Sequence, residues 1–126
     1  MMNNTFSDIV ELLHIRANQE PLGIAYTFLL MDKEDEFKPV NVTYQQLEQQ
    51  AQAIAVNLKS ILKPGQRTLM FYPAGLEFIS AFFGCLYAGV VAIPAYPPRK
   101  NHHFSRLEAI VSDSQAQVIL TTNSVL

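Results

Sequence analysis

Apolar positions in the second half of the chain alternate between two spacings. Short runs of apolar and β-branched residues predict buried strands, and apolar residues three or four positions apart between those runs predict helices. The predicted strands are residues 68–72, 90–94 and 118–122, and the predicted helices are residues 76–87 and 105–114. Strands that alternate with helices are typical of right-handed βαβ units. We therefore expect an α/β fold with a mainly parallel sheet flanked by helices.

The first third of the chain has a different pattern, a helix followed by a hairpin. Apolar residues at helical spacing predict a helix over residues 7–18, with Ser7 and Asp8 as suitable start residues. Residues 24–31 are mostly apolar and rich in β-formers, and residues 40–42 are compatible with a short second strand. The charged residues 32–36 between them indicate a solvated, exposed turn.

A long amphipathic helix is predicted between the hairpin and the first parallel strand. Thr43 followed by Gln46 matches a capping box, in which each side chain satisfies a backbone N–H that the helix leaves open. Pro64 and Gly65 end the helix. The residues expected on its apolar stripe are Leu47, Ala51, Ile54, Ala55, Leu58, Ile61 and Leu62. A second capping box is predicted from Ser105 to Glu108.

The uncharged run over residues 78–96 is long enough for a transmembrane helix, which needs roughly 17–25 residues. Gly84, Gly89 and Pro94 interrupt this run, and β-branched residues follow Gly89. An apolar helix, a glycine stop and a buried strand explain this order better than one membrane span. The large side chains that the helix is expected to bury are Phe78, Ile79, Phe82, Phe83 and Leu86.

Composition and charge narrow the class of protein. The chain has 126 residues, is 49% hydrophobic and 16% charged, and has a formal net charge of −2. This length is that of one domain, and the low charge argues against intrinsic disorder. Nine Lys and Arg against eleven Asp and Glu leave no basic surface for nucleic acid. A single cysteine excludes an internal disulfide framework, and we expect a cytoplasmic location.

Candidate chemistry lies where the predicted parallel strands end, because ligands of such sheets bind beyond the carboxyl ends of the strands. After residues 68–72 comes a small turn at residues 73–75, which lacks the glycine spacing of a nucleotide-binding loop. After residues 90–94, a proline-rich segment holds Tyr96 and Arg99, which can present a ring and a guanidinium to a ligand or serve as a stiff connector. Cys85 is expected to be a buried, inert thiol.

The string FFGCLYAGVVAIPAYPPR, together with VTYQQLEQQAQAIAVNL before it and RLEAIVSDSQAQVILTT after it, resembles the opening of the large N-terminal domain of acyl-adenylating enzymes. Within that superfamily the chain is most similar to the fatty acyl-AMP ligases. The resemblance covers almost the whole chain and is looser over residues 1–40. It implies that residues 1–126 are a single, truncated N-terminal part of an AMP-binding domain.

The resemblance also implies an activity for a longer parent protein. Fatty acyl-AMP ligases use ATP and Mg²⁺ to convert a fatty acid into an acyl-adenylate, and they pass the acyl group to an acyl carrier protein. Tyr96 and Arg99 belong to a segment that marks the family. Phe82 and Phe83 are candidates for approaching an acyl tunnel, although packing against the sheet explains them equally well. These four residues are the expected substrate contacts.

The phosphate loop, the nucleotide-binding motifs and the catalytic lysine of the family are absent from this sequence. We therefore expect the chain alone to be inactive, to bind no cofactor and to contain no catalytic or metal-ligating residue. Two alternatives remain open: a part of a fatty acyl-CoA synthetase, or a non-catalytic module that binds an acyl chain or a protein. A partial sheet leaves an open edge, so we also expect self-association of the chain.

Overall fold

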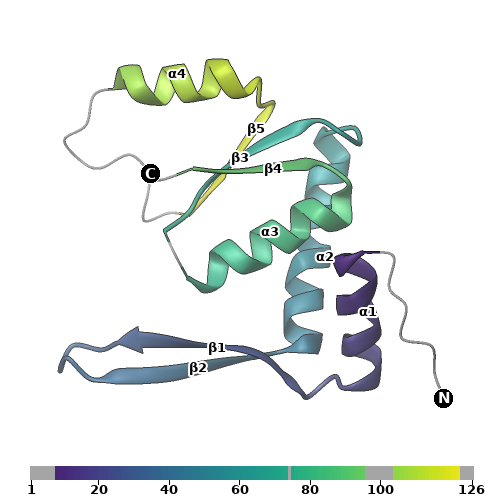
Figure 1. The fold of residues 1–126 in the computed structure, drawn as a ribbon, viewed down its shortest axis with the longest axis vertical. Coiled ribbons are helices and arrows are strands. Elements are labelled where there is room, and N and C mark those ends of the chain that lie inside the picture. Colours follow the sequence, from purple (N-terminus) through teal and green to yellow (C-terminus); the bar gives the residue numbers. More distant parts are fainter. Residues whose placement is uncertain (1–7, 74, 96–103, 123–126) are drawn as a thin grey trace. The chain divides into compact units, whose positions relative to one another are not determined.

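The computed structural model describes residues 8–73, 75–95 and 104–122, and they form two compact units (Figure 1). The first unit comprises residues 1–50 and the second residues 51–126, and the boundary falls within one helix. Each unit has its own buried apolar residues.

The first unit consists of helix α1 (Ile9–Gln19), strands β1 (Ile24–Met31) and β2 (Phe37–Thr43), and the start of helix α2 (Tyr44–Ile61). Asp8 caps α1, because its carboxylate accepts a hydrogen bond from the Glu11 N–H at 2.8 Å. This confirms the predicted start of the helix at Asp8; Ser7 lies outside the described residues. The apolar side chains that this unit buries most fully are Leu13, Ala17, Val42 and Leu47.

Strands β1 and β2 form an antiparallel hairpin, as predicted, but β2 is longer than expected because it begins at Phe37. The turn explains the difference. The Asp32 carboxylate accepts hydrogen bonds from the backbone N–H groups of Glu34 and Glu36, at 2.8 and 3.0 Å. This network closes the turn tightly, so strand pairing extends to Met31 and Phe37 at its edge.

The predicted capping box at the start of α2 is confirmed. The Gln46 N–H donates to Thr43 Oγ1 at 3.1 Å, and the Thr43 N–H donates to Gln46 Oε1 at 2.9 Å. At the other end of α2, Ile61 is 65% exposed, so the expectation that it belongs to the buried stripe is wrong. Leu62, which follows the helix, is buried and takes that place in the core.

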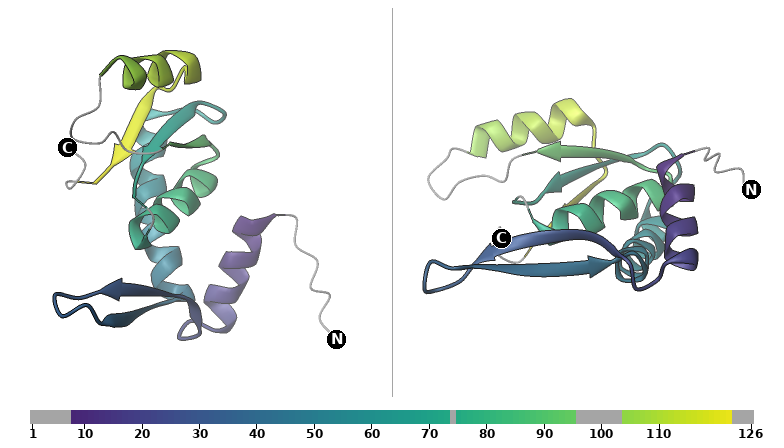
Figure 2. Two further views of the ribbon diagram at one scale, coloured as in Figure 1. Left: turned by 60° about the vertical axis from the view of Figure 1, so that its left-hand side comes forward. Right: turned by 60° about the horizontal axis from the view of Figure 1, so that its bottom comes forward.

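The second unit is built on a parallel sheet of three strands in the order β4-β3-β5. Its strands are β3 (Arg67–Phe71), β4 (Val91–Ala95) and β5 (Val118–Thr121). Helix α3 (Leu76–Ala88) connects β3 to β4, and helix α4 (Phe104–Ser114) connects β4 to β5. The two helices lie on opposite faces of the sheet (Figure 2). The predicted α/β fold with parallel strands is thereby confirmed.

Small residues, rather than the predicted aromatic residues, form the buried face of α3. Ser80, Ala81, Gly84, Cys85 and Ala88 are buried. The large side chains that were expected to be buried are only half-buried, although Phe78 and Phe82 pack against the core; these side chains are Phe78, Ile79, Phe82, Phe83 and Leu86. The reason is the close approach of α2: a Cβ atom on Gly84 would lie 2.6 Å from Ile54 Cγ2. Only small side chains fit at such a spacing.

Two further predictions concern the end of α3 and the start of α4. Gly89 ends α3 in the left-handed conformation, with φ 73°, as the glycine stop predicted. Helix α4 begins at Phe104, so Ser105 lies inside the helix and not at the cap position expected for it. None of the helices in the described ranges is both long and apolar enough to cross a bilayer, which agrees with reading residues 78–96 as a helix and a strand.

Candidate functional site

The carboxyl ends of the three parallel strands form the edge of the sheet at which a ligand site is expected. After β3 the chain enters α3 on one face of the sheet, and after β4 it leads to α4 on the other face (Figure 2). Adjacent strands whose connections leave toward opposite faces open a crevice between their carboxyl ends. The crevice edge of this unit therefore lies at Phe71 and Ala95, the paired last residues of β3 and β4.

Tyr72 is the first residue after β3 and is half-buried against the core of the second unit. Burial raises the pKa of its phenol, and the negative charge of Glu77 raises that pKa further, with a smaller effect from Cys85. The phenol therefore stays protonated at neutral pH and remains available as a hydrogen-bond donor. Sequence reasoning assigned Tyr72 only to a strand. Its position at the carboxyl end of a predicted parallel strand was the signal that could have identified it.

Thr121, the last residue of β5, joins two strand ends at this edge. Its hydroxyl donates a hydrogen bond to the Phe71 carbonyl oxygen, at 2.9 Å. Phe71 and Thr121 are also paired in the parallel register. This hydrogen bond holds the carboxyl end of β3 next to the end of β5, and so fixes the position at which the chain leaves β3.

The start of α3 is poorly suited to a phosphate. Gly75 caps the helix without any side-chain hydrogen bond, and Glu77 places a negative charge in the first turn. A helix N-terminus attracts anions, but the adjacent carboxylate opposes a second negative group. Among the described residues 72–77 and 122 there is no lysine or arginine. These residues therefore do not fit the triphosphate of ATP.

The predicted contacts Phe82 and Phe83 lie together on α3 and are half-buried. Phe82 stacks on Phe78 with ring centroids 6.3 Å apart and meets the Phe83 ring edge-on at 6.2 Å. Phe78 and Phe82 also pack against the core of the unit. Packing thus accounts for Phe82, and a contact of Phe82 or Phe83 with an acyl chain stays a prediction.

The other two predicted contacts, Tyr96 and Arg99, lie outside the described residues. Ala95, which directly precedes Tyr96, ends β4 at the crevice edge. Their role in binding a substrate therefore stays a prediction.

Cys85 is a free cysteine in the core, as predicted. Burial raises its pKa to about 11, so the thiol is protonated at neutral pH and unsuited to nucleophilic attack.

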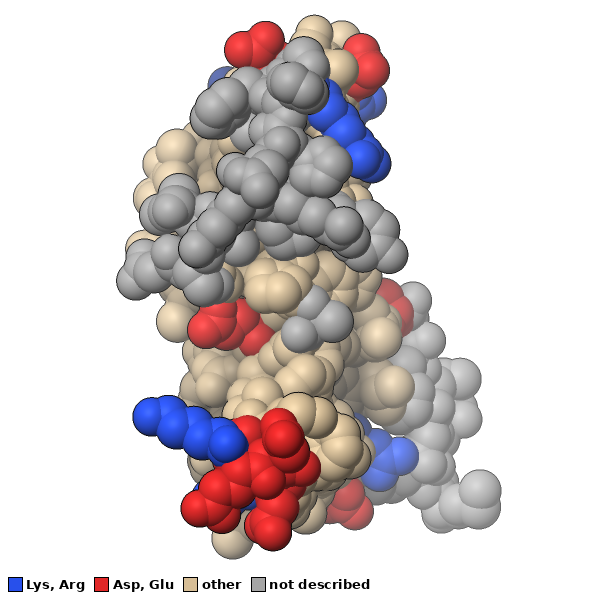
Figure 3. All heavy atoms as spheres, turned by 90° about the vertical axis from the view of Figure 1, so that its left-hand side faces the viewer, with Lys and Arg blue, Asp and Glu red and all other residues tan. Residues whose placement is uncertain are grey.

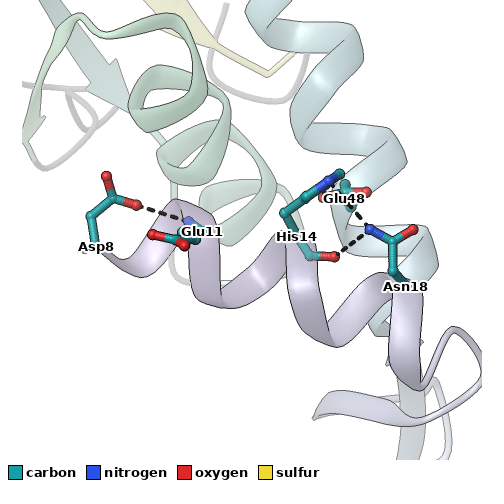
Figure 4. Close-up of polar contacts among 5 residues, drawn as sticks. All are labelled: Asp8, Glu11, His14, Asn18 and Glu48. Atoms are coloured by element: carbon teal, nitrogen blue, oxygen red, sulfur yellow. Dashed lines mark hydrogen bonds and ion pairs between the residues drawn. The ribbon is translucent and has the colours of Figure 1, made fainter. Parts of the chain in front are cut away.

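Figure 4 shows a polar network around His14 of α1. The sequence alone indicated no partner for this histidine. His14 Nδ1 lies 2.9 Å from Glu48 Oε2, and so joins α1 to the start of α2. The Asn18 side-chain amide contacts His14 Nε2 at 3.3 Å and donates to the His14 carbonyl oxygen at 3.0 Å. Partners 34 residues apart cannot be recognised from local spacing. The network connects α1 to the start of α2.

Acidic side chains gather at the end of the hairpin (Figure 3). The carboxylates of Asp32, Glu34 and Glu36 have oxygens within 4.8 Å of one another. The N–H groups of Glu36 and then Glu34 lower the pKa of Asp32, and Lys38 lies 3.4 Å from its carboxylate. Through these contacts Asp32 stabilises the turn, and the acidic residues belong to a solvated loop, as predicted.

Residues 13–126 match the model of a protein family described as AMP-binding enzyme. The chain is 47% identical over 125 residues to the medium-chain fatty acid–acyl carrier protein ligase JamA of Moorena producens. It is 36% identical over 122 residues to the long-chain fatty acid–AMP ligase FadD26 of Mycobacterium tuberculosis. These alignments cover 96% and 97% of this chain, but only 20% and 21% of the relatives.

Solved structures show the same similarity. A fatty acid AMP ligase from Legionella pneumophila superposes with a TM-score of 0.85 and 33% identity, over 98% of this chain and 22% of that one. A fatty acyl-adenylate ligase from the same organism, in complex with acyl adenylate and pyrophosphate, gives a TM-score of 0.85 and 36% identity, over 95% and 20% of the two chains. The chain thus spans about a fifth of the length of the proteins it matches.

Proposed function

Because this chain belongs to the AMP-binding enzyme family, we propose that it is the N-terminal part of a fatty acyl-AMP ligase. The observation that carries the proposal is the 47% identity to a fatty acid–acyl carrier protein ligase, which extends over 96% of the chain. The similarity in fold to a ligase that holds acyl adenylate and pyrophosphate supports the same activity.

The proposed reaction has two steps. A fatty acid carboxylate attacks the α-phosphorus of ATP, which gives an acyl-adenylate and releases pyrophosphate. The thiol of an acyl carrier protein then takes the acyl group and releases AMP. The first step develops negative charge on phosphate oxygens, which cationic groups and Mg²⁺ stabilise. Since the reaction consumes ATP, we place it in the cytoplasm.

We assign this chain a supporting role in the reaction. The described residues at the crevice edge offer the phenol of Tyr72 and the carboxylate of Glu77, but no cation for a phosphate. The groups that hold ATP and Mg²⁺ are therefore proposed to come from the larger remainder of the enzyme. The parallel sheet of the second unit places the carboxyl ends of β3 and β4 next to each other at the crevice edge.

The product of the reaction tests this function. The protein encoded when the reading frame is followed beyond Leu126 is incubated with ATP, Mg²⁺ and a fatty acid, and then with either acyl carrier protein or coenzyme A. We expect acyl-adenylate, followed by acylated carrier protein. Formation of acyl-CoA instead would identify a fatty acyl-CoA synthetase and overturn the proposal.

A binding assay addresses the remaining alternative, a non-catalytic module. The 126-residue chain is titrated with a fluorescent fatty acid, and we expect no saturable binding, since the crevice is only partly built by this chain. Saturable binding by the chain alone would favour a standalone acyl-binding module.

A further inference from the structure

We draw no further inference here: the strongest candidate, the outer edge of β1, which is unpaired among the described residues, together with the exposed apolar side chains of Leu29, Met31 and Phe37 on the same hairpin, carries none, because the chain spans about a fifth of its relatives and nothing in the structure shows what covers this surface.

Discussion

Gly84 determines how closely α3 approaches α2. An added Cβ atom would lie 2.6 Å from Cγ2 and 2.7 Å from Cβ of Ile54, and 3.2 Å from the Ala51 carbonyl oxygen. We expect Gly84→Ala to destabilise the fold by about 1–3 kcal/mol, because the gain in helix propensity does not offset the displacement of α2. Urea unfolding measures the loss.

The geometry also predicts how Gly84→Ala responds to a second substitution. Ile54→Ala removes Cγ2 but keeps the Cβ atom at 2.7 Å. The double variant should therefore recover only part of the loss. Full recovery, or a Gly84→Ala variant as stable as the original chain, would contradict close helix packing at this position.

Thr68 is fully buried in the central strand β3, and its hydroxyl has no hydrogen-bond partner within the described structure. Thr68→Val keeps the shape of the side chain and removes the unpaired hydroxyl. Because an unsatisfied buried polar group costs roughly 1–3 kcal/mol, we expect the free energy of unfolding to rise by about 1 kcal/mol.

The same substitution at Thr121 is a matched control. Its hydroxyl donates to the Phe71 carbonyl oxygen, so Thr121→Val should lower the free energy of unfolding instead. Chemical denaturation of both variants gives the two values. If both substitutions raised, or both lowered, the free energy of unfolding, the difference in hydrogen bonding between the two hydroxyls would not explain their effects.

At the scale of one element, the start of α2 depends on the reciprocal hydrogen bonds between Thr43 and Gln46. Thr43→Ala should destabilise the chain by about 1 kcal/mol, because it leaves the Gln46 N–H without its partner. Thr43→Ser keeps the hydroxyl and should retain most of the stability. Thermal or urea unfolding compares the two variants, and equal losses would contradict a capping role for the hydroxyl.

Helices and strands were predictable from the sequence where local chemistry decides their limits. The Thr43 capping box, the Gly89 stop and the extent of β1 needed only neighbouring residues. The face of α3 was mispredicted because hydrophobicity favours Phe82 and Phe83, whereas the spacing from Ile54 admits only Gly84 and other small residues. Such a spacing arises from tertiary packing and has no signature in the local sequence.

For the whole molecule, the carboxyl edge of the sheet was predictable from the order of strands and helices. Contacts between residues far apart in the sequence were less predictable. Thr121 and Tyr72 gain their roles from bonds and charges that the fold brings together, and His14 meets Glu48 across 34 positions. The likeness of residues 82–99 to acyl-adenylating enzymes suggested a function that composition and periodicity alone did not.

We propose that this chain builds part of the scaffold of a fatty acyl-AMP ligase, while the groups that act on ATP lie in the remainder of the enzyme. Fatty acid-dependent exchange between pyrophosphate and ATP tests it most directly. The exchange is measured with the purified 126-residue chain and with the longer protein that begins with this chain and continues beyond Leu126. We predict exchange by the longer protein and none by the 126-residue chain. Exchange by the 126-residue chain alone, or no exchange by the longer protein, would contradict the claim.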